Sequence, residues 1–72
     1  MHSDSINNQY EVDKKDIAYL VSVIEAYDHL AVVRTLDQKR GLIEMLISPD
    51  FIDEVDKLVE NLSKEIPIRK VN

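Results

Sequence analysis

The 72-residue sequence predicts a single α+β domain, a two-layer sandwich with the element order β-α-β-β-α-β. Three observations predict it. Four short segments have the pattern of strands, two other stretches repeat apolar residues at helical spacing, and the one glycine ends the loop between the second and third strands. A chain of this length has room for one core. We expect residues 6–72 to form the domain and residues 1–5, which are mostly small and polar, to be a flexible end.

The first two expected elements are a strand and a helix. Residues 6–12 alternate in polarity, which predicts a strand with one polar face. Asp13 stands where a helix N-cap belongs, and apolar residues recur at helical spacing from Lys14 to about Tyr27. A second apolar stripe on this helix is formed by Tyr19, Val23 and Ala26. A helix this apolar needs cover on more than one side, which in so small a domain indicates a partner subunit.

A β-hairpin is expected in the middle of the chain. Its first strand is residues 30–36, its loop residues 37–41 and its return strand residues 42–47. Gly41 ends the loop, where a hairpin of this length needs a residue at positive φ.

The last two expected elements are a helix and an edge strand. Ser48 is a candidate N-cap and Pro49 suits the first helical position, so a helix begins here and ends near Lys64. Residues 66–71 then alternate as a strand. Pro67 places that strand at a sheet edge, because proline has no N–H to donate to a second neighbour.

This order is satisfied most simply by a ferredoxin-like, split-βαβ topology. It has a four-stranded antiparallel sheet with both helices on one face, and its first and third strands are central. The other face has no helix over it and would carry Leu42 and Leu46 with either Val32 or Val33. Exposed apolar patches commonly mark interfaces, so we expect a homo-oligomer, most simply a dimer.

Charge and hydropathy exclude several classes of partner. The chain has nine basic and fourteen acidic residues and a net charge of −5, which does not provide the clustered basic face that nucleic acid requires. Its longest apolar run is too short to cross a membrane, and its first residues lack the pattern of a signal peptide. We therefore expect a cytoplasmic protein that binds neither nucleic acid nor membrane.

Catalytic motifs are not evident either. Without cysteine there is no thiolate, and one glycine cannot form a phosphate-binding loop. His29, beside Asp28, is interpreted as a residue that ends the first helix rather than as half of a metal site. The sequence thus predicts neither an enzyme nor a cofactor or metal.

Polar residues near the end of the second strand have two interpretations. Arg34 can form a cross-strand ion pair with Glu44, and we favour this structural interpretation. Alternatively, Arg34, Thr35 and Asp37 contact an anion or an amino acid at the strand end.

The chain also resembles known proteins over roughly residues 10–68. The resemblance is to a family of small uncharacterised bacterial proteins with an ACT-like domain. The residues that carry it are Asp16-Ile17-Ala18-Tyr19-Leu20 through Glu25-Ala26-Tyr27-Asp28, Val33-Arg34-Thr35-Leu36-Asp37, Arg40-Gly41 and Ile47-Ser48-Pro49-Asp50.

ACT domains are typically regulatory modules that dimerise and bind amino acids at the subunit interface. Their site usually includes a glycine at the join of the first strand and first helix, where this sequence has Val12-Asp13-Lys14-Lys15-Asp16. The resemblance implies an amino-acid ligand near Asp13, Lys14, Lys15 and Asp16, with Arg34 as a further contact. We therefore expect a non-catalytic binding or regulatory module that acts as a homo-oligomer; the alternative is an ACT-type amino-acid sensor at a dimer interface.

Overall fold

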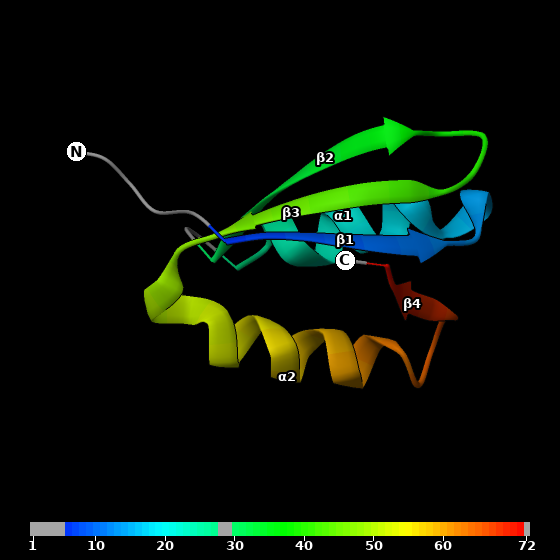
Figure 1. The fold of residues 1–72 in the computed structure, drawn as a ribbon. Coiled ribbons are helices and arrows are strands. Elements are labelled where there is room, and N and C mark those ends of the chain that lie inside the picture. Colours follow the sequence, from blue (N-terminus) through cyan, green and yellow to red (C-terminus); the bar gives the residue numbers. More distant parts are fainter. Residues whose placement is uncertain (1–5, 28–29, 72) are drawn as a thin grey trace.

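A computed structural model describes residues 6–27 and 30–71 of the chain. The predicted flexible end and the predicted helix end at Asp28 and His29 lie outside these residues. The elements are, in order, β1 (Ile6–Val12), the 3-10 turn η1 (Lys14–Asp16), α1 (Ile17–Glu25), β2 (Ala31–Asp37), β3 (Leu42–Ile47), the 3-10 turn η2 (Pro49–Phe51), α2 (Ile52–Leu62) and β4 (Ile68–Lys70) (Figure 1).

The strands form one antiparallel sheet in the order β2-β3-β1-β4, which confirms the ferredoxin-like α+β prediction with β1 and β3 in the centre (Figure 1). The last strand is shorter than predicted and begins at Ile68. The N–H of Ile66 donates instead to the Leu62 carbonyl at 2.9 Å, so Ile66 continues the end of α2. Pro67, which has no N–H, lies between this turn and β4.

Both helices begin later than the sequence predicted, because each is preceded by a 3-10 turn. Asp13 and Ser48 have extended backbones and accept the first turn hydrogen bond through their carbonyl oxygens, from Asp16 and Phe51. Neither side chain makes a capping hydrogen bond, so the predicted cap is formed by the backbone alone. The Asp13 carboxylate is therefore not used to begin the helix.

The core lies between one sheet face and both helices. Ile43, Met45 and Ile47 on β3 are completely buried, and so are Leu20 on α1 and Val55 on α2. All belong to a single apolar cluster, so both helices cover the same face, as predicted. Within the described residues, no helix is long and apolar enough to cross a membrane.

Among the described residues, the core also contains the polar side chain of Asn8. Asn8 is 6% exposed, and its side-chain amide donates a hydrogen bond to the Tyr10 hydroxyl at 3.2 Å. Both residues lie on the helix-facing side of β1, in the alternation that the sequence shows.

The open face carries the apolar residues that the sequence placed there. Leu42 and Leu46 are half-buried, and Val32, rather than Val33, lies on this face, opposite Leu46, with 60% of its surface accessible. Arg34 lies opposite Glu44 in register, with 3.7 Å between Arg34 Nη1 and Glu44 Oε1. The predicted cross-strand pair is thus confirmed.

The second apolar stripe of α1 is only partly covered within this chain. Tyr19 is 45% exposed, Val23 is half-buried and Ala26 is exposed. The Tyr19 hydroxyl donates a hydrogen bond to Glu65 Oε1 at 2.6 Å, and this contact connects α1 to the turn that follows α2.

Candidate functional site

Gly41 joins the hairpin loop directly to the end of β1. Its φ is +71°, and a Cβ at this position would lie 1.8 Å from the carbonyl oxygen of Val12. The Val12 N–H donates to the Gly41 carbonyl at 2.9 Å. Only glycine allows this approach, which brings the residue before it, Arg40, beside Glu11 on β1.

The loop itself is shaped by Asp37. Asp37 Oδ1 accepts a hydrogen bond from the backbone N–H of Arg40 at 3.2 Å, and Gly41 N–H donates to the Gln38 carbonyl at 3.2 Å. An aspartate that accepts from a nearby backbone N–H is a common way to close such a turn. Asp37 therefore helps to determine where the Arg40 backbone lies.

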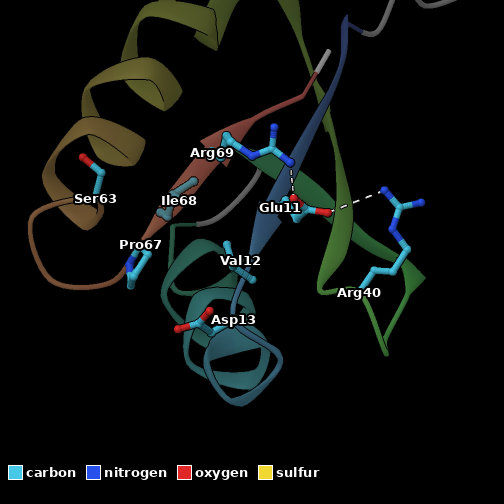
Figure 2. A pocket seen from close by; sticks show the side chains of 8 residues that line it. All are labelled: Glu11, Val12, Asp13, Arg40, Ser63, Pro67, Ile68 and Arg69. Atoms are coloured by element: carbon cyan, nitrogen blue, oxygen red, sulfur yellow. Dashed lines mark hydrogen bonds and ion pairs between the residues drawn. The ribbon is translucent and has the colours of Figure 1, made fainter.

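Glu11 is contacted by two arginines from different parts of the sheet. Arg69 lies opposite Glu11 in the pairing of β1 with β4, and its guanidinium donates a hydrogen bond to Glu11 Oε1. Arg40 Nη2 is 3.5 Å from the other oxygen, Oε2 (Figure 2). We call these three residues the Glu11 cluster.

The Glu11 cluster forms part of the wall of a surface cavity of about 420 Å³ at the end of the sheet (Figure 2). The cavity also contacts the end of β1, the end of α2 and the start of β4. Its lining residues are Glu11, Val12, Asp13, Arg40, Ser63, Pro67, Ile68 and Arg69. The Ser63 hydroxyl donates to the Glu60 carbonyl at 2.6 Å, so its oxygen lone pairs remain available as acceptors.

The electrostatics of the cavity are dominated by these side chains. The hydrogen bond from Arg69 lowers the pKa of Glu11 below its ordinary value, and the positive charges of Arg69 and Arg40 act in the same direction against the effect of burial. Glu11 therefore stays ionised near neutral pH. Its side chain is 25% exposed, whereas those of Arg69 and Arg40 are 71% and 61% exposed, so both guanidinium groups present further donors to solvent.

Two other cavities lie toward the opposite end of the sheet. One, of about 290 Å³, is lined by Tyr27 and Leu30 and by four residues of α2, namely Glu54, Lys57, Leu58 and Asn61. The other, of about 380 Å³, is lined by Leu30, Ala31, Val32, Leu46 and Ser48, none of which is charged. The cavity beside Glu11 is thus the one that gathers two guanidinium groups and two carboxylates, and we take it as the candidate site.

The structure brings one of the seven predicted ligand-binding residues to this cavity, namely Asp13. Lys14, Lys15 and Asp16 form η1 immediately after it, and both lysines are exposed; none of the three lines the cavity.

The three predicted residues of β2 lie elsewhere. Arg34 is paired with Glu44 on the open face, Thr35 lies exposed beside an irregularity in the β2–β3 pairing, and Asp37 closes the hairpin loop. The structure does not bring these residues together with Asp13.

The sequence interpretation missed the three members of the Glu11 cluster. Part of the signal was present. Glu11 is on the polar side of the first strand, and the predicted topology makes the first and last strands antiparallel neighbours. Arg69 is a basic residue of that last strand, so a Glu11–Arg69 pair could have been inferred. The position of Arg40 depends on loop geometry, which the sequence pattern did not give.

Fold and cavity together define a small ferredoxin-like α+β domain with a charge-lined cavity at one end of its sheet. A family model described as "Domain of unknown function (DUF4911)" matches residues 10–66, which is most of the chain, and the chain belongs to this family. Comparisons with curated proteins and with solved structures gave no significant match.

Proposed function

We propose that this chain is a non-catalytic regulatory module of the cytoplasm that binds a small zwitterion, an amino acid in the first instance, in the cavity beside Glu11. The observation that carries the proposal is the charge arrangement of that cavity. Arg40 and Arg69 supply two positive charges, and Glu11 and Asp13 supply two negative charges.

A zwitterion matches this arrangement, because its negative group can contact the arginines while its positive group contacts a carboxylate of the cavity. Guanidinium groups bind carboxylates well, since their fixed fork of donors matches the two carboxylate oxygens. The Asp13 carboxylate, which makes no capping hydrogen bond, is a suitable acceptor for an ammonium group. A volume of about 420 Å³ also falls in the range of known small-molecule sites.

The uncharged part of the wall favours a ligand with a small apolar side chain. Val12, Pro67 and Ile68 contribute apolar surface between the charged groups. A ligand carbon chain that covers this surface would remove it from water at a gain of roughly 25 cal/mol per Å².

The position of the cavity supports an ACT-like affiliation. ACT domains usually bind amino acids near the join of the first strand and the first helix, and Val12 and Asp13 are at that join here. No glycine occupies the join, but Gly41 of the neighbouring loop makes the close backbone approach at the same place.

We propose further that the module is a homodimer that pairs through its open sheet face. The support is the exposed Val32 opposite the half-buried Leu46, with Leu42 farther along the same face beyond the Arg34–Glu44 pair; a second copy would cover these apolar side chains. Light scattering is expected to give twice the chain mass of 8.3 kDa, and Val32→Lys is expected to return the protein to a monomer. A wild-type mass of 8.3 kDa would remove the dimer from the proposal.

The binding proposal is tested by thermal melts against the standard amino acids. A ligand at about 100 times its Kd adds about 2.7 kcal/mol, and about 1 kcal/mol moves the midpoint of so small a domain by roughly 4–8 °C. Asp13→Asn should weaken the shift, whereas Asp16→Asn, with the same charge change outside the cavity, should not. No shift with any amino acid would contradict the proposal.

A further inference from the structure

The two arginines of the cavity already have an anion between them, and that anion is Glu11. One carboxylate oxygen accepts from Arg69 and the other faces Arg40 at 3.5 Å (Figure 2). We infer that Glu11 occupies the position of a ligand's anionic group, and that such a group binds by displacing Glu11 from Arg40 and Arg69. This inference rests on the proposed function, since it concerns control of the same cavity.

The geometry makes displacement feasible. The 3.5 Å separation of Arg40 from Glu11 is longer than the roughly 2.7–2.9 Å of a charge-assisted hydrogen bond, so this contact is loose. Both arginine side chains are mostly exposed, and solvent screens ion pairs of this kind. A ligand can therefore approach both guanidinium groups without opening the core.

Glu11 also opposes the binding of a second anion while it remains in place. The four charges of the cavity sum to zero, so an incoming anion meets no net attraction and lies close to a like charge. If Glu11 is neutralised, the remaining charges sum to +1. A ligand therefore reaches Arg40 and Arg69 only if its anionic group binds them better than Glu11 does. Glu11 thus acts as an intramolecular competitor of the ligand.

The alternative is that Glu11 only fastens β4 to the sheet. β4 pairs with β1 at three residue positions, and Arg69 is the middle one, so a contact between Glu11 and Arg69 has structural value by itself. In that case neutralising Glu11 changes stability but leaves the affinity of the arginines for anions unaltered. The two explanations therefore differ in a binding measurement.

The test uses sulfate as the probe, because sulfate keeps the same charge across the pH range in which carboxylates titrate. Sulfate is titrated into the wild type, Glu11→Gln and Glu44→Gln, and the side-chain Nε–H signals of Arg40 and Arg69 are followed by NMR. Glu44→Gln is the matched control, since it removes the same charge from the other ion-paired glutamate of the open face, outside the cavity.

We expect Glu11→Gln to bind sulfate roughly tenfold more tightly than the wild type, and Glu44→Gln to resemble the wild type. Equal affinity in all three proteins, or a matching gain in Glu44→Gln, would overturn the inference and leave amino-acid binding standing. If neither sulfate nor any amino acid binds to any of the proteins, the inference and the proposed function both fail.

A second measurement needs no variant and keeps the test valid if Glu11→Gln does not fold. In the wild type, saturating sulfate should raise the pKa of the Glu11 carboxyl toward its ordinary value, because displacement removes the hydrogen bond from Arg69. Sulfate that binds and leaves the pKa of Glu11 unchanged would overturn the inference.

Discussion

Two glutamates on the open face of the sheet have arginine partners, and their surroundings differ. Glu44 on β3 faces Arg34 across a regular strand pair, with 3.7 Å between the charged atoms. Glu11 on β1 contacts Arg69 from β4 and Arg40 from the hairpin loop, and these residues line a cavity. The same residue types therefore form a flat surface pair in one place and a concave, charge-lined site in the other.

The difference comes from where each pair lies in the sheet. The Arg34–Glu44 pair is in the middle of the hairpin, and neither residue lines any of the three cavities described above. The Glu11 cluster is at the end of the sheet, where the loop, β4 and the end of α2 meet around the end of β1. An ion pair thus becomes a candidate binding site only where the fold leaves space beside it.

The largest effect is expected at Gly41, which brings Arg40 beside Glu11 and has no counterpart at the Arg34–Glu44 pair. Gly41→Ala should lower the free energy of unfolding by at least about 2 kcal/mol, because its left-handed backbone is unfavourable for alanine and its Cβ would clash with the Val12 carbonyl. Thermal unfolding should show a loss of roughly 10 °C. Lys39→Ala in the same loop is the control, with an expected change within about 0.5 kcal/mol. A Gly41→Ala protein as stable as the wild type would refute this account of the loop.

The next largest effect comes from comparing Arg69 of the Glu11 cluster with Arg34 of the Arg34–Glu44 pair. Arg69→Gln should weaken the binding of an amino acid roughly tenfold to a hundredfold, because it removes a charged hydrogen-bond donor from the cavity. Arg34→Gln removes the same charge from the flat pair and should leave affinity unchanged. Calorimetric titration of both variants measures the difference, and equal losses would mean that only net charge matters.

The pKa of Glu11 provides a third comparison. Because the folded state lowers this pKa, Glu11 contributes stability at pH values above its ordinary pKa, and that contribution is lost as the pH falls through the lowered value. Arg69→Gln should raise the pKa of Glu11 toward 4.5, and Arg40→Gln should raise it less, because the hydrogen bond from Arg69 is the main cause. NMR titration of the side-chain carboxyl measures both. A larger change in Arg40→Gln would contradict the assignment of cause.

The smallest effect is expected at the Arg34–Glu44 pair. A double-mutant cycle with Arg34→Gln and Glu44→Gln should give a coupling free energy of no more than about 0.5 kcal/mol, because Arg34 is 62% exposed and solvent screens the pair. Chemical denaturation of the four proteins measures it. A coupling of several kcal/mol would show that the pair is a main support of the hairpin.

These comparisons also explain how much the sequence could predict. The alternation of β1 and β3 determined their bounds and buried faces, because a strand with one buried face has only one workable register. The topology followed from the order of the elements, and the Arg34–Glu44 pair followed from the expected hairpin. Element ends were less predictable, since the 3-10 turns η1 and η2 and the helical continuation at Ile66 depend on local backbone geometry.

The candidate site was harder to predict than the fold. Asp13 was identified as a possible ligand contact because the resemblance to ACT domains implies a ligand at the join of the first strand and the first helix, and Asp13 lines the cavity. Arg40 and Arg69 are far apart in the sequence and meet at Glu11 only through the pairing of β1 with β4 and the approach of Gly41 to Val12. The predicted strand order was enough to infer the contact of Arg69 with Glu11, but the position of Arg40 depends on loop geometry that no sequence pattern gave.

The most direct test of the account is an NMR titration of the wild-type protein with glycine and alanine. The account predicts saturable shifts in the signals of Glu11, Asp13, Arg40 and Arg69, with those of Arg34 and Glu44 unchanged. Shifts that gather at Arg34 and Glu44 instead, or the absence of saturable shifts at the Glu11 cluster, would contradict the claim that the cavity at the end of the sheet binds the ligand.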